Sequence, residues 1–108
     1  MAKKVLGQSN PSATTLTTLY TVPASKEAVV SSISIANLTA TAATFRIAIR
    51  PAGASITNAH YFGYEITVGA SDTTIITVGI TLATTDVISV YASTANLVFQ
   101  AFGDEASV

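Results

Sequence analysis

The alternation of apolar and polar side chains along short, β-branched stretches constrains the fold of this chain more than any other feature. In the clearest case Phe45, Ile47 and Ile49 occupy every second position, with Arg46 and Arg50 among the residues between and after them. A period of two puts the apolar three on one face of a β-strand and both arginines on the other face. An amphipathic helix needs apolar residues spaced by three or four. We therefore predict a strand here.

The rest of the chain favours the same secondary structure. Ser and Thr contribute 28 of the 108 residues, and Val and Ile contribute another 20. Ser and Thr disfavour helix interiors, and β-branched side chains suit a pleated, half-buried surface. No stretch of about 10 to 15 residues shows helical periodicity. Further strands are expected at residues 19–22, 28–36, 61–68, 74–80, 87–92 and 97–102, which makes about seven to eight in all.

Short turn-forming segments separate these strands at regular intervals. They are residues 23–25, 37–41, 51–53, 69–72, 83–86 and 93–96, rich in Pro, Gly, Asn, Asp and Ser. Brief strands with such spacing indicate an all-β fold, a single antiparallel β-sandwich of jelly-roll or immunoglobulin-like topology. The residues leave both topologies open. The longest expected loop runs from Gly53 to Ala59, where a short helical turn is an alternative.

A chain of 108 residues has the size of one domain. We expect an N-terminal arm at residues 1–12, a β-sandwich domain at 13–103 and a C-terminal tail at 104–108. The arm is the segment expected to become ordered on a neighbouring molecule, because it lacks a core of its own. Asp104 and Glu105 are interpreted as part of a solvated tail.

Charged residues make up only 10% of the chain, against roughly 25% in a typical soluble domain. With five Lys and Arg and a net charge of -1, we expect no nucleic-acid partner, because phosphate binding needs clustered cations. The sequence contains no near-continuous apolar run of about 20 residues, which a membrane-spanning helix needs. We therefore expect no membrane span. Few charges also leave sheet edges unprotected. We therefore expect a homo-oligomer or a subunit of a larger particle, the alternative being a charge-poor monomer.

Residue types that carry catalysis are scarce. The chain has one His, no Cys and six dispersed carboxylates, whereas acid–base and nucleophilic catalysis need such groups brought together. His60 lies in no G-x-S-x-G context, and no glycine-rich phosphate loop or calcium-loop spacing is present. We predict a protein that is not an enzyme and takes no cofactor or metal. Asp72 and Asp86 are expected to accept hydrogen bonds in their own turns.

Four residues are candidates for contact with a partner. Arg46 and Arg50 share the outer face of one strand and could pair with carboxylates of a neighbouring subunit, since a guanidinium binds a carboxylate in bidentate fashion. Charges that only face solvent are the alternative. His60 and Tyr61 are expected at a strand edge or a subunit contact.

Several segments also suggest a family. They are residues 19–24, Phe45-Arg46 leading to Arg50–Gly53, His60-Tyr61, residues 79–82 and residues 86–93. This diffuse pattern, from about Gly7 to Gly103, resembles small virion proteins of tailed bacteriophages, including phages of cyanobacteria and marine bacteria. The resemblance implies a head decoration or cement protein, often a trimer, bound to the major capsid protein. Such a protein is made in the host cytoplasm and stabilises the capsid surface.

Two other functions stay open. A tail, baseplate or fibre-attachment subunit would share this composition and differ in partner and copy number. A carbohydrate- or receptor-binding module would need exposed aromatic side chains beside polar groups. Tyr61, Tyr64 and Tyr91 are the candidates for that role, although they form no cluster in the sequence.

Overall fold

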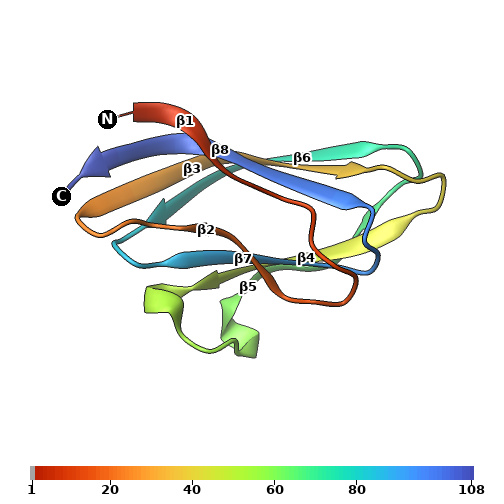
Figure 1. Cartoon of the computed structure of the whole chain (residues 1–108), viewed down its shortest axis with the longest axis horizontal. Coiled ribbons are helices and arrows are strands. Elements are labelled where there is room, and N and C mark those ends of the chain that lie inside the picture. Colours follow the sequence, from red (N-terminus) through yellow and green to blue (C-terminus); the bar gives the residue numbers. More distant parts are fainter. Residues whose placement is uncertain (1) are drawn as a thin grey trace.

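The computed structural model describes residues 2–108, and it consists of two four-stranded antiparallel sheets packed face to face (Figure 1). The strands are β1 (Ala2–Ser9), β2 (Thr17–Thr21), β3 (Lys26–Asn37), β4 (Ala43–Arg50), β5 (Tyr61–Val68), β6 (Thr73–Leu82), β7 (Val87–Ala92) and β8 (Leu97–Ser107). Two single-turn 3-10 helices, η1 (Pro51–Gly53) and η2 (Asn58–His60), lie between β4 and β5. The predicted all-β sandwich is confirmed.

The strand order identifies the topology. Sheet A has the order β1-β8-β3-β6, and sheet B has the order β2-β7-β4-β5. The pairs β1 with β8, β2 with β7, β3 with β6 and β4 with β5 are nested like the two arms of one long hairpin. Winding that hairpin around itself adds the pairs β3 with β8 and β4 with β7. Eight strands in this arrangement form a jelly roll. An immunoglobulin-like sandwich instead pairs several consecutive strands.

The core lies between the sheets. Phe45 of β4 and Phe99 of β8 come from opposite sheets and pack edge to face, with ring centroids 5.9 Å apart. Other fully buried side chains surround them: Val22, Val30, Ile33, Ile35, Ile47, Val68, Ile88, Val90 and Leu97. Phe45 and Ile47 face this core as the alternation predicted, while Arg46 and Arg50 alternate with them and are only partly buried.

The segment expected as an N-terminal arm is a strand of sheet A. β1 runs antiparallel to β8, from the pair Ala2 and Glu105 to the pair Ser9 and Phe99. Met1 of the expected arm lies outside the described residues. The two ends of the chain consequently meet in one sheet (Figure 1). A local pattern could not reveal this pairing, because the two partners lie almost the whole chain apart.

The interpretation of Glu105 as part of a solvated tail is wrong. β8 continues to Ser107, and Glu105 is only 7% exposed. Its carboxylate accepts a hydrogen bond of 2.6 Å from the Tyr20 hydroxyl and pairs with the Lys4 ammonium at 2.7 Å. Lys4 and then Tyr20 hold the pKa of Glu105 below its ordinary value. Burial, followed by the bond to Glu105, raises the pKa of Tyr20.

The predicted turn aspartates act locally. Asp86 accepts hydrogen bonds of 2.9 Å from the backbone amides of Ala83 and Ala52, so it joins its own turn to η1. Asp72 accepts a bond of 2.8 Å from the amide of Thr73, where β6 begins. The expectation that each Asp accepts hydrogen bonds in its own turn is confirmed for Asp86, whereas Asp72 bonds to the first residue of the strand that follows its turn.

Candidate binding surface on sheet B

Three tyrosines and one arginine gather on the outer face of sheet B. Arg46 of β4 stands directly opposite Tyr91 of β7, and its guanidinium carbon lies 4.1 Å from that ring centroid. The same carbon lies 4.4 Å from the Tyr64 ring and 6.0 Å from the Tyr61 ring, both on β5. Tyr61 and Tyr64 contact each other edge to face at 5.0 Å. These four residues, called the tyrosine cluster below, are held by cation–π and aromatic contacts.

Irregular pairing of β5 makes the cluster possible. Residues three apart in a regular strand, such as Tyr61 and Tyr64, point to opposite faces of the sheet. The register of β5 against β4 shifts on both sides of Gly63. On one side Tyr64 and Glu65 together oppose the single residue Arg46, which is a β-bulge. The two shifts bring both tyrosines to the same guanidinium.

Glu65 carries the backbone strain of this bulge. Its φ is +51°, in the left-handed region that non-glycine residues seldom occupy, and it is the one such residue within a strand in the described part of the chain. Strain of this kind costs on the order of 1–3 kcal/mol. The Glu65 carboxylate lies 2.8 Å from Nη2 of Arg46. This hydrogen bond lowers the pKa of Glu65 and raises that of Arg46.

A hollow of about 340 Å³ opens beside the two β5 rings, lined by Asn58, Tyr61 and Tyr64. Tyr64 is 57% exposed. Asn58 starts η2, whose last residue is His60. Nδ1 of His60 accepts a hydrogen bond of 3.2 Å from the amide of Thr57. His60 thus stabilises the turn that places Asn58 and Tyr61 beside the hollow.

Arg50, the remaining residue predicted at an interface, forms hydrogen bonds within its own loop and to β7. Its guanidinium donates to the carbonyl oxygens of Ala54 at 2.7 Å and Gly53 at 3.0 Å, and to the hydroxyl of Ser89 at 3.2 Å. These bonds hold the chain as it leaves β4. The structure therefore brings Arg46 and Tyr61 into one cluster, with His60 supporting it and Arg50 fixing the adjacent loop.

In the sequence, Tyr64 and Tyr91 stand out only as separate aromatic candidates, and no pattern singles out Glu65 or Asn58. One available signal was Gly63. A glycine inside a strand pattern often marks a bulge, and a bulge changes which side chains share a face. Without it, the spacing of Tyr61 and Tyr64 argues against a common site.

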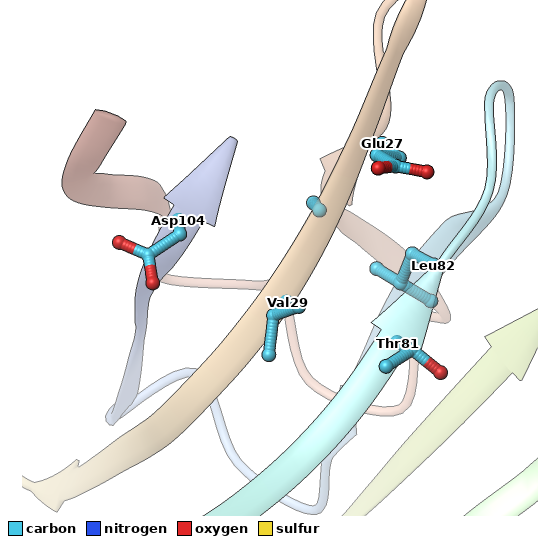
Figure 2. A pocket seen from close by; sticks show the side chains of 6 residues that line it. Glu27, Val29, Thr81, Leu82 and Asp104 are labelled. Atoms are coloured by element: carbon cyan, nitrogen blue, oxygen red, sulfur yellow. The ribbon is translucent and has the colours of Figure 1, made fainter. Parts of the chain in front are cut away.

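A smaller hollow, of about 180 Å³, lies on sheet A and is lined by residues of β3, β6 and β8. Figure 2 shows Glu27 and Asp104 on opposite sides of the β3 ribbon, so these carboxylates do not converge. One carboxylate oxygen of Asp104 is buried without a hydrogen-bond partner. Nowhere in residues 2–108 do three or more His, Asp or Glu side chains gather as a metal site requires.

The outer edge of sheet A is formed by β6, a strand of ten residues without charge or proline that pairs only with β3 among the described strands. Ile75 on this strand is 68% exposed. Three inward-facing side chains, Ile76, Val78 and Ile80, contact the core but stay partly exposed. The opposite edge, β1, carries Lys3 and Lys4. Of the two edges of sheet A, β6 is therefore the one without the charges that proteins usually use to block further strand pairing, and the five-residue edge strand β2 of sheet B is also uncharged.

Comparisons with protein families, with curated proteins and with solved structures find no match to this chain. None of the helices within residues 2–108 has the length and apolar character needed to cross a membrane. The tyrosine cluster on sheet B and the open β6 edge of sheet A are therefore the two features on which a function can be based.

Proposed function

We propose that this chain is a structural protein of a tailed-phage virion, without enzymatic activity, of the head decoration or cement type. It would bind the shell of major capsid protein from outside as a homo-oligomer, for which the resemblance favours a trimer. Jelly rolls occur in viral capsid proteins and also in lectins and cupins. The fold is therefore compatible with the proposal but does not by itself select it.

The observation that carries the proposal is the uncharged edge of β6. An edge strand presents unpaired backbone amides and carbonyls, and free monomers usually block it with charge, proline or a covering segment. Here ten residues carry neither charge nor proline, and partly exposed Ile76, Val78 and Ile80 lie along the strand. Strand addition by a neighbouring chain would satisfy the backbone groups and cover these side chains. An assembled particle supplies such neighbours.

The proposed mechanism is mass action. A protein that binds only the assembled shell stabilises that shell in proportion to its occupancy, as any ligand specific for one state does. Neither a cofactor nor a reaction is required. The useful properties are a rigid fold and surfaces that pack repeatedly.

Copy number in purified particles tests this proposal. Quantitative mass spectrometry would compare this chain with the major capsid protein of the same particles. Copies on the scale of the capsid protein are expected for a decoration protein. A small fraction of that number would indicate that the chain belongs to the tail, the baseplate or the fibre attachment. Absence from the particle would contradict a virion role altogether.

A further inference from the structure

The hollow beside the tyrosine cluster has a composition that selects one class of ligand. Two aromatic rings, Tyr61 and Tyr64, and one amide, Asn58, line it. The rings offer apolar faces, while the phenol hydroxyls and the amide can each donate and accept hydrogen bonds. Ligand sites commonly combine such apolar surfaces with a few polar groups that fix orientation.

The local charges are already matched. The guanidinium of Arg46 is paired with Glu65 at 2.8 Å and lies within 4.4 Å of the centroids of the Tyr64 and Tyr91 rings. Arg50 donates to Gly53, Ala54 and Ser89. Neither arginine is left as a free anion receptor, and Glu65 is not a free receptor for a cation. The ligand that fits is consequently neutral.

The geometry of the tyrosine cluster also costs the isolated chain conformational free energy. Glu65 has a left-handed backbone inside a strand, and Tyr64 keeps 57% of its surface exposed. Bulges often occur next to functional sites, where they redirect side chains. Here the redirection produces a pair of rings at 5.0 Å that opens beside the polar side chain of Asn58.

We propose that this hollow binds a neutral saccharide. One face of a pyranose ring presents C–H groups that pack on an aromatic ring, and its hydroxyls donate and accept hydrogen bonds. Tyr64 is the stacking platform, Tyr61 is the second wall, and Asn58 is the hydrogen-bonding group at the rim. Arg46 and Glu65 position the rings. This inference does not depend on the virion proposal, since it concerns the isolated protein.

The binding test uses the full chain and a panel of neutral oligosaccharides built from glucose, galactose, mannose and N-acetylglucosamine. Sialylated and sulfated oligosaccharides serve as charged comparators. The chain has no Trp, and three of its four Tyr belong to the cluster, so tyrosine fluorescence reports on the site. Backbone amide NMR shifts locate the binding surface. We expect saturable binding of at least one neutral member, with shifts confined to β4, β5, β7 and the 51–60 loop.

Matched variants separate this site from the rest of the surface. Tyr64→Ala removes the exposed platform and is expected to weaken binding about tenfold. Phe62→Ala removes another exposed ring of β5, 49% exposed and outside the lining of the hollow, and should leave affinity within about twofold. Circular dichroism would verify that both variants fold.

Several results would overturn the inference. They are no saturable binding of any neutral member, binding only of the charged comparators, or binding that Tyr64→Ala and Phe62→Ala affect equally. If the hollow is instead a protein contact, no saccharide will shift its amides, and Tyr64→Ala will change the mass of the oligomer. None of these results depends on whether the chain is found in a virion.

Discussion

At the scale of single residues, Glu105 shows how one buried carboxylate joins distant parts of the chain. Tyr20 of β2 donates to one of its oxygens, and Lys4 of β1 pairs with the other. The contacts link both strands to β8, and the first of them also joins sheet B to sheet A. A buried carboxylate is tolerated because both oxygens have partners.

This arrangement predicts a stability that depends on pH. Because the pKa of Glu105 is lower in the folded chain than its ordinary value of 4.5, folding favours the ionised form. Its contribution should be complete above that value and be lost as the pH falls through the lower, folded pKa. Urea unfolding at pH 7 and pH 3 should show a smaller pH-dependent loss for Glu105→Gln than for the wild type. Glu27→Gln, at an exposed position, should retain the full loss, and equal losses in all three proteins would contradict the assignment.

Phe45 tests the orientation of β4. The ring is fully buried against Phe99, so Phe45→Ala should lower the free energy of unfolding by roughly 3–5 kcal/mol. Phe62→Ala removes a ring of the same size that is 49% exposed, and the expected change is within about 0.5 kcal/mol. Chemical denaturation of both variants provides the comparison. Similar losses would show that β4 does not face the core as described.

At the scale of elements, the sequence predicts a strand where the pattern that marks it lies within that strand, and misses it where the strand depends on a distant partner. The strands at 61–68 and 87–92 match β5 and β7 residue for residue, because alternation and turn residues lie within the segments themselves. β1 was missed, since its place depends on pairing with β8 at the other end of the chain. The tyrosine cluster was missed for a related reason. The register shift between Tyr61 and Gly63 breaks the strict alternation of side chains, so Tyr61 and Tyr64 share a face although they are three residues apart.

Two glycines in different elements make a matched test of how the sheets meet. A Cβ added at Gly7 of β1 would lie 2.1 Å from the backbone oxygen of Leu19 of β2, so the backbones themselves would have to separate. Gly7→Ala should therefore destabilise the protein, by about 1–3 kcal/mol for overpacking. At Gly79 of β6 an added Cβ meets nothing within 4 Å, and Gly79→Ala should cause no loss. Thermal unfolding would separate the two, and equal midpoints would contradict the close contact of β1 with β2.

At the scale of the whole molecule, the two surfaces lie on different sheets. The β6 edge belongs to sheet A, whereas the tyrosine cluster lies on the outer face of sheet B. The low charge content, at 10% of residues, is then a property of a chain that covers part of its surface with neighbours, since charges would oppose edge pairing.

Ile75→Lys puts a charge on the β6 edge strand at a position that is 68% exposed. The fold should tolerate it, because exposed substitutions usually change stability by less than about 0.5 kcal/mol. Strand addition at β6 should be prevented, because lysines on edge strands are a common natural block to pairing. Light scattering at several protein concentrations should show an oligomer for the wild type and a monomer for Ile75→Lys.

Thr67→Lys is the matched control, because it puts the same charge at an exposed position on β5, one of the two edge strands of sheet B. If the oligomer forms through β6, this variant keeps the mass of the wild type. Loss of the oligomer in both variants would indicate a general effect of charge, and loss in Thr67→Lys alone would move the contact to sheet B. A wild type that stays monomeric at every concentration would contradict the proposed homo-oligomer.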